Sequence, residues 1–364
     1  DVAIGYGRLR VLPADYTGPI LTSDIDQTFL DTPLHSTQGL METLFENPGQ
    51  KRPIFALPEF YRQMQSREIP LLFISASPHF FRRTLSAVFE HHRIEFTGLH
   101  LKYLQGTFDN IVKKVTETLL NLNDFFSQGV GASVERTVKF LGSSVMTLFD
   151  HTSYKLITLL ENRLMQPTGA REILMGDNKE SDFFIFSLYQ ALIAGAIPLE
   201  GLEEYLYRLN FSDREALTRD AARRILKLTR ANRERHGDQN SVNAVWINLS
   251  RDEPNDAAML DLVREALPKS GAQYADHADF CAPRSARGGA GFSLLACADG
   301  QITEEALVSV LKSGIGGTYQ SGEMTVERTL GFIADFGAQE AETGFAVSGI
   351  IAELENANGT GNGS

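Results

Sequence analysis

The chain has 364 residues, of which 43% are hydrophobic and 22% are charged. These proportions are typical of a globular protein that buries a real core, as one large α/β domain with additions or as two domains. The net charge of −12 argues against a general nucleic-acid binder, which would carry a basic surface, so we expect no nucleic-acid partner. A local basic cluster could still contact a membrane surface.

Cysteine content and the first residue bear on the compartment. Cys281 and Cys297 are too few for a disulfide framework, so we expect a cytoplasmic protein, with peripheral membrane contact as an open alternative. The chain begins at Asp1 without a methionine, so an exported form whose signal peptide has been removed also stays open. The longest uncharged run, residues 183–199, is shorter than the ~20 apolar residues of a membrane-spanning helix, and we expect a buried helix and a turn there.

Four apolar runs predict the strands of a parallel sheet. The first lies within residues 18–28, as a short apolar strand that ends in a polar loop. Three similar runs follow, over residues 69–78, 172–178 and 242–249. Helical patterns lie between them, over residues 80–91, 154–164 and 182–194. This alternation predicts an α/β fold with a doubly wound parallel sheet, in which ligands bind at the carboxyl ends of the strands.

Two segments depart from this alternation. Residues 103–150 carry apolar side chains at helical spacing, which predicts a helical cap inserted in the core. The tail begins with a glycine-rich turn at residues 288–291 and continues with helical stretches around 302–312 and 325–355, before a disordered end. We therefore expect a core over residues 1–284 and a mainly helical C-terminal extension over residues 285–364.

The sequence Asp24-Ile-Asp-Gln-Thr stands at the predicted end of the first strand. Two carboxylates at this spacing converge where the chain turns, and close like charges are unfavourable unless a cation lies between them. Mg²⁺, which prefers oxygen ligands, meets that need. One carboxylate can also attack phosphorus, while the other protonates the leaving oxygen and later deprotonates water. The pattern therefore indicates metal-dependent phosphoryl transfer.

Further polar groups follow at the other predicted strand ends. Ser75 follows the second strand and can bind a phosphate oxygen, helped by backbone N–H groups at the start of the next helix. Lys155 supplies a positive charge for the transferring phosphoryl group. Asp177 and Asp182 follow the third strand and supply two more carboxylates for the metal.

In order, residue type and placement, these groups resemble the four motifs of the haloacid-dehalogenase (HAD) phosphatases. The resemblance implies a HAD-like Rossmannoid core in which Asp24 is the nucleophile, Asp26 is the general acid/base and Lys155 is also catalytic. It implies a Mg²⁺ ion held by Asp24, the Asp26 carbonyl and Asp177, with Asp182 supporting the metal shell. It further implies that phosphate is bound by Thr28, Ser75, Ala76 and Lys155.

Finer detail resembles the phosphatidate phosphatases of the actin-patch-protein type, which are relatives of the lipins. The likeness lies in residues 73–81, 154–155 and 173–182, and it covers roughly residues 18–250. The chain departs from the family at Gln27, where a second acidic residue is common, and at His79, where another aromatic residue is common. The resemblance implies hydrolysis of phosphatidate to diacylglycerol and phosphate through an aspartyl-phosphate.

Several alternatives stay open. Residues 103–150, with the basic pair Lys113-Lys114, dock on an anionic membrane or pack on the core as a soluble cap. Arg82 and Arg83 contact a lipid headgroup or form a solvated helix face. The substrate is phosphatidate or a soluble phosphoester. A catalytically weak phosphatidate-binding module is a third reading, but such a module would be expected to have lost a catalytic carboxylate.

Overall fold

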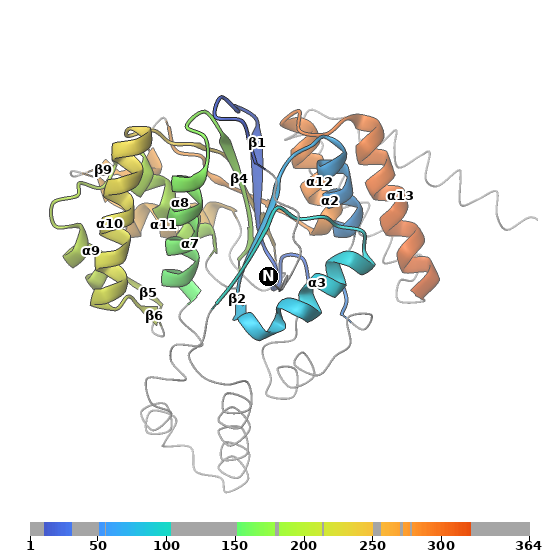
Figure 1. Ribbon diagram of the computed structural model, residues 1–364, viewed down its shortest axis with the longest axis horizontal. Coiled ribbons are helices and arrows are strands. Elements are labelled where there is room, and N and C mark those ends of the chain that lie inside the picture. The colour runs from blue at the N-terminus through green and yellow to red at the C-terminus, as the bar shows by residue number, and fades with distance from the viewer. Residues whose placement is uncertain are drawn as a thin grey trace, which may run out of the picture.

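The computed structural model describes residues 11–30, 51–54, 56–102, 151–178, 182–212, 215–249, 256–269, 272–276 and 279–321. Within these ranges a sheet of six strands lies between two layers of helices (Figure 1). Every pair of neighbouring strands in this sheet is parallel. The predicted doubly wound α/β class is therefore confirmed.

The order of the strands places a reversal of the winding direction at the centre of the sheet. The order is β10-β7-β4-β1-β2-β3. The strands are β1 (Pro19–Asp24), β2 (Leu71–Pro78), β3 (Gly98–Lys102), β4 (Arg171–Asp177), β7 (Val242–Asn248) and β10 (Pro283–Ala286). The chain winds from β1 outward to β3 and then returns to the other side of β1 for β4. Ligands of such sheets bind outside the carboxyl ends of the strands at this switch point.

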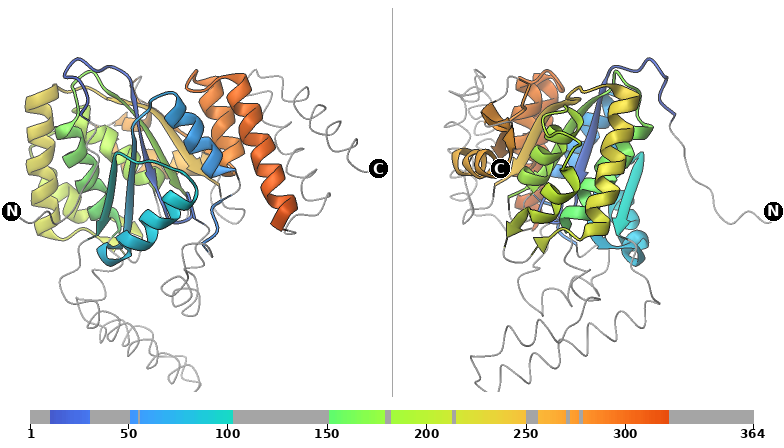
Figure 2. Two further views of the ribbon diagram at one scale, coloured as in Figure 1. Left: turned by 45° about the vertical axis from the view of Figure 1, so that its right-hand side comes forward. Right: turned by 90° about the vertical axis from the view of Figure 1, so that its left-hand side faces the viewer.

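Helices cover both faces of the sheet (Figures 1 and 2). One face carries α2 (Leu57–Ser66), α3 (Arg82–His91), α12 (Gly288–Ala298) and α13 (Glu304–Ser321). The other carries α7 (His151–Met165), α8 (Asp182–Ile193), α9 (Leu202–Arg208), α10 (Arg219–His236) and α11 (Asp256–Ala266). Small elements complete the fold: η2 (His79–Phe81), η3 (Tyr274–Asp276), and the strand pairs β5 (Asn210–Ser212) with β6 (Glu215–Ala216) and β8 (Pro268–Lys269) with β9 (Ala272–Gln273).

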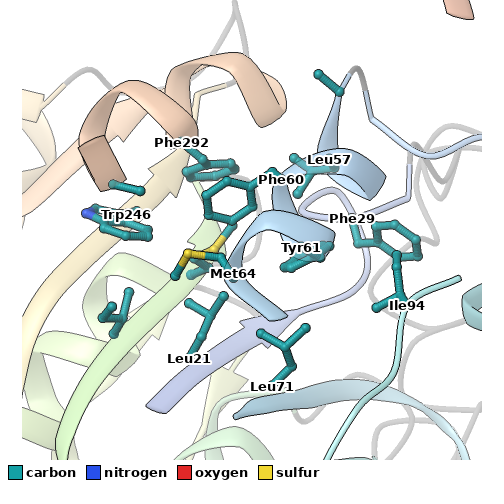
Figure 3. Close-up of a cluster of buried hydrophobic side chains, with 14 of the residues drawn as sticks. Leu21, Phe29, Leu57, Phe60, Tyr61, Met64, Leu71, Ile94, Trp246 and Phe292 are labelled. Atoms are coloured by element: carbon teal, nitrogen blue, oxygen red, sulfur yellow. The ribbon is translucent and has the colours of Figure 1, made fainter. Parts of the chain in front are cut away.

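Two hydrophobic cores hold these layers together. Successive side chains of a strand point to opposite faces, so Phe73 of β2 enters one core and Ile74 enters the other. Figure 3 shows the first core, where Phe60 of α2 and Phe292 of α12 pack beside Trp246 of β7. Both faces of the sheet are therefore buried, which is why its strands read as continuous apolar runs in the sequence.

The uncharged run predicted to form a buried helix does so. All residues of α8 are buried between the sheet and its neighbouring helices. Among the residues that the structure describes, no helix combines the length and the apolar character that a membrane crossing requires.

The C-terminal part of the described chain differs from the prediction. Strand β10 pairs with β7, so the boundary predicted at residue 284 falls inside a strand of the main sheet. Residues 288–291 begin helix α12 and do not form the predicted turn. A Cβ on Gly289 would lie 2.3 Å from the backbone carbon of Ala56, so this glycine allows a close approach of α12 to the start of α2. Helix α13 confirms the helical stretch predicted around 302–312. The predictions for residues 103–150 and 325–364 lie outside the described residues.

Candidate active site

Three carboxylates and one ammonium group meet at the carboxyl ends of β1 and β4, at the lower edge of the sheet in Figure 1. Asp24 ends β1, Asp177 ends β4 and Asp182 begins α8; one carboxylate oxygen from each lies within 4.8 Å of the others. Lys155 reaches them from α7, with Nζ 2.8 Å from Asp24 Oδ1 and 2.6 Å from Asp182 Oδ1. All four side chains are buried. The structure thus brings together four residues that the sequence singled out from separate segments.

The loop after β1 is closed by its own backbone. The N–H groups of Phe29 and Leu30 both donate to the carbonyl of Ile25, at 2.8 and 2.9 Å. The N–H of Gln27 donates to the carbonyl of Leu30 at 2.8 Å, and Gln27 has a φ of 58°. The N–H of Ile54 adds a bond to the carbonyl of Phe29 from outside the loop, at 2.8 Å. This tight turn carries Asp26 and Thr28 back toward the strand ends.

Asp26 is held from the side of β2. Its Oδ2 accepts hydrogen bonds from Ser75 Oγ at 2.8 Å and from Ser77 Oγ at 2.9 Å. The backbone N–H of Ser77 in turn donates to Ser75 Oγ at 2.9 Å. Strand β2 continues past Ser75 to Pro78, with an irregular register against β3 in between. Two serines of β2 therefore hold the carboxylate of Asp26 at the carboxyl end of that strand.

Thr28 has the features of a ligand-binding hydroxyl. Its side chain is fully buried, and its Oγ1 has no hydrogen-bond partner among the residues that the structure describes. A buried hydroxyl left without a partner costs about 1–3 kcal/mol, and a hydrogen bond to a ligand oxygen would remove that cost. Ala76, the other predicted phosphate contact, is buried on β2 between Ser75 and Ser77 and can offer only its backbone groups.

The charge balance of the site fits a divalent cation. Among the described residues, three buried carboxylates lie together beside the ammonium of Lys155, and like charges this close favour a cation between them. All the candidate ligand atoms are oxygen atoms, which Mg²⁺ prefers.

Burial raises the pKa of Tyr61 well above its ordinary value, and the charge of Asp24 raises it further. The Tyr61 hydroxyl lies 2.7 Å from Ser23 Oγ, and the Ser23 hydroxyl donates to the carbonyl of Asp24 at 2.7 Å.

Three further residues shape the site without having been predicted as site residues. Ser77 is the second donor to Asp26, and the two serines of Ser-Ala-Ser share one side of the strand, which is the signal that could have revealed it. A Cβ on Gly176 would lie 2.5 Å from Cβ of Asp182, so only glycine leaves room for that carboxylate. Asn248, at the end of β7, donates from Nδ2 to the carbonyl of Gln27 at 2.7 Å.

The two arginines predicted to meet a headgroup differ in their contacts. Arg82 donates from its guanidinium to the carbonyl of Leu99 at 2.7 Å, which ties the start of α3 to β3. Arg83 is exposed on α3. Burial raises the pKa of the nearby Tyr154 to about 12, while the charge of Arg82 acts in the opposite direction. A contact of either arginine with a lipid headgroup stays a prediction.

A comparison with protein families identifies part of this chain. Residues 20–128 match the family described as phosphatidate phosphatase APP1, catalytic domain. The matched span includes Asp24, Asp26 and Ser75, while Lys155 and Asp177 lie beyond it. Comparisons with curated proteins and with solved structures found no match. The predicted resemblance to the actin-patch type is confirmed, and the chain is a phosphatase of the phosphoric monoester hydrolase class, similar over residues 20–128 to the catalytic domain of phosphatidate phosphatase APP1.

Proposed function

We propose that this protein is a Mg²⁺-dependent phosphatidate phosphatase that forms an aspartyl-phosphate on Asp24. The observation that carries the proposal is the convergence of Asp24, Asp177 and Asp182 on Lys155 at the switch point of the sheet. At such a switch point, loops that follow strands on either side of the reversal lie around the same ligand site. The family match supports phosphatidate as the substrate.

The proposed metal site uses groups that the structure places side by side. Asp24, Asp177 and Asp182 would hold Mg²⁺, with the backbone carbonyl of Asp26 as a further oxygen ligand. A bound Mg²⁺ ion would neutralise charge on the phosphoryl oxygens, so that an anionic carboxylate can approach an anionic phosphate. Lys155 lies where its ammonium can balance the charge of Asp24 before the substrate arrives and that of the phosphoryl oxygens afterwards.

In the proposed reaction the Asp24 carboxylate attacks phosphorus, and the bond between phosphorus and the diacylglycerol oxygen breaks. Asp26 gives its proton to that oxygen, which leaves as the alcohol. Asp26 then takes a proton from water, the water oxygen attacks phosphorus, and the bond to Asp24 breaks to release inorganic phosphate. Ser75 and Thr28 would donate hydrogen bonds to the phosphoryl oxygens. Since Ser75 Oγ now donates to Asp26, its hydroxyl would turn to the phosphoryl group, and Ser77 would keep Asp26 in place.

The alternatives differ in substrate and in catalysis. A soluble phosphoester would use the same catalytic groups, so substrate choice depends on the family match and on surfaces beyond them. A phosphatidate-binding module without activity is disfavoured, because Asp24, Asp26, Lys155 and Asp177 are all present in the sequence. Membrane contact through residues 103–150 and headgroup contact through Arg82 and Arg83 belong to the same proposal.

The test is phosphate release from mixed liposomes that contain phosphatidate, with and without Mg²⁺, beside glycerol phosphate and p-nitrophenyl phosphate. We expect Mg²⁺-dependent release that is faster on phosphatidate. Asp24→Asn should lower it by at least about 10³-fold with the fold intact. Asp220→Asn, at an exposed position of α10, is the matched control and should retain activity.

Each contrary result has a distinct meaning. Substantial activity in Asp24→Asn would refute the covalent step. Equal activity in the presence of a chelator would refute the metal. Release from small esters alone would favour the soluble substrate, and liposome binding without release would favour the binding module.

A further inference from the structure

One side-chain amide at the end of β7 joins two segments that are far apart in the sequence. Asn248 Nδ2 donates to the carbonyl of Gln27 at 2.7 Å, and the N–H of Gly288 donates to Asn248 Oδ1 at 3.0 Å. The donor and the acceptor of an amide are different atoms, so both bonds form together in only one orientation of the group. The two contacts therefore fix the side chain of Asn248.

The first contact reaches the middle of the catalytic loop. Gln27 lies between Asp26 and Thr28 and has a φ of 58°, a backbone conformation that residues other than glycine rarely adopt. Its N–H is bonded to Leu30 within the loop, and its carbonyl is bonded to Asn248. Among the described residues no peptide bond is cis, so turning the Gln27 carbonyl toward Asn248 directs the N–H of Thr28 the opposite way. Asn248 thereby sets the direction of the peptide group that joins Gln27 to Thr28.

The second contact comes from a part of the chain that cannot easily move. Gly288, with a φ of 59°, begins α12 directly after β10. The next residue, Gly289, packs so closely on Ala56 that an added Cβ would lie 2.3 Å from its backbone carbon. The donor that orients Asn248 is therefore fixed against the start of α2.

The backbone of Asn248 also ties it to the site. In the sheet it lies opposite Asp177 of β4 on one side and Ala286 of β10 on the other. Since β4 separates β7 from β1, the side chain reaches across the end of β4 to the loop that follows β1. Asn248 thus spans the strand end that carries Asp177.

We propose that Asn248 is a positioning residue for phosphoryl transfer, which holds the catalytic loop through the Gln27 carbonyl so that Asp26 and Thr28 face Asp24 and Asp177. Through the same amide, the start of α12, directly after β10, helps to position the catalytic loop. The catalytic half of this inference rests on the proposed function. The tether itself rests only on the two contacts and can be tested without substrate or metal.

The most informative substitution is Asn248→Asp. It retains the size of the side chain and the oxygen that accepts from Gly288, but it replaces the donor to Gln27 with an oxygen that faces a carbonyl oxygen. The loop should be released on that side. Misplacement of reacting groups by about 1 Å can lower a rate 10²-fold, so we expect kcat to fall by about 10- to 100-fold. KM should change by less than about threefold, because the loss lies in alignment of the reacting groups.

The experiment combines hydrogen–deuterium exchange of the full chain with steady-state phosphate release from phosphatidate liposomes. In Asn248→Asp, amides of residues 25–30 should exchange faster without metal or substrate, and kcat should fall at a nearly constant KM. Asn243→Asp is the matched control, since Asn243 is exposed on the same strand, and it should change neither quantity. Asn248→Ser, which is smaller and cannot reach both partners, should behave like Asn248→Asp and replaces it if that variant does not fold.

The outcomes separate this inference from the proposed function. Wild-type exchange in residues 25–30 of the folded variants overturns the tether. Faster exchange with unchanged kcat overturns the role in catalysis. If the wild-type protein releases no phosphate, the proposed function fails, and the exchange result still decides whether Asn248 holds the loop.

Discussion

Replacing Gly176 with alanine tests the packing of the proposed metal site. Gly176 precedes Asp177 on β4, and a Cβ built at this position would lie 2.5 Å from both Cβ and Oδ2 of Asp182. Carbon atoms in contact are ordinarily separated by about 3.5–4.0 Å, so Asp182 would have to retreat by about 1 Å. Asp182 starts α8, whose residues are all buried, so it has little room to do so.

The magnitude follows from what Asp182 contacts. Its Oδ1 lies 2.6 Å from Lys155 Nζ, and its Oδ2 accepts from the N–H of Asp177 at 3.3 Å. A misplacement of about 1 Å can reduce a rate by about 10²-fold, which corresponds to about 2.7 kcal/mol of lost transition-state stabilisation. Overpacking should lower the free energy of unfolding by a further ~1–3 kcal/mol.

The assay is kcat/KM for phosphate release together with the Mg²⁺ concentration needed for half-maximal activity, and unfolding in urea. Gly176→Ala should lower kcat/KM by about 10²-fold and require more Mg²⁺. Gly98→Ala on β3 is the control, because its Cβ would meet only the far ends of two side chains, Cδ2 of Leu72 at 2.9 Å and Nε2 of His100 at 3.2 Å. Activity of Gly176→Ala within about threefold of wild type would show that the position of Asp182 does not govern the reaction.

Three other perturbations give distinct results. Lys155→Met should abolish phosphate release and, because it removes an ammonium that contacts two buried carboxylates, lower stability by about 3–5 kcal/mol without Mg²⁺; a thermal melt that Mg²⁺ shifts no more than in wild type would contradict this. Ser77→Ala removes one of two donors to Asp26, so turnover of an ester with a poor leaving group should fall more than that of p-nitrophenyl phosphate, and an equal loss on both would argue against a role through Asp26. Burial raises the pKa of Glu172, so the stability that its protonated form contributes is present below the ordinary carboxyl pKa and is lost as pH rises through the raised folded value. Glu172→Gln should flatten that loss in urea unfolding across pH, and an unchanged pH profile would contradict it.

The sequence revealed those parts of the fold whose signals are local. β1 and β4 are apolar runs that end in aspartate, so both the strands and the carboxylates at their ends could be identified directly. β10 contains proline, arginine and serine in four residues, and only its pairing with β7 makes it a strand. The three glycines of residues 288–291 predict a turn, whereas in the structure they begin α12, where close packing on Ala56 requires glycine at position 289.

The candidate site also contains residues that the sequence predicts and contacts that it does not. The residue types and their order predicted which side chains would meet, because parallel strands bring their carboxyl ends to one edge. The alternation in Ser-Ala-Ser indicates that Ser75 and Ser77 share one side of β2, but their contacts with Asp26 join two segments that are far apart in the sequence, so local patterns do not predict them. The proposed role of Asn248 depends on a hydrogen bond from the end of β7 across β4 to the loop after β1. The residues next to Asn248 in the sequence do not predict this contact.

The most direct test of the central claim is a rapid acid quench of wild-type protein with phosphatidate and Mg²⁺, followed by mass spectrometry of the peptide that contains Asp24. The account predicts a phosphoryl group on Asp24 that is absent without Mg²⁺ and absent in Asp24→Asn. Turnover with no phosphoryl group on Asp24, or with the group on another residue, would contradict it.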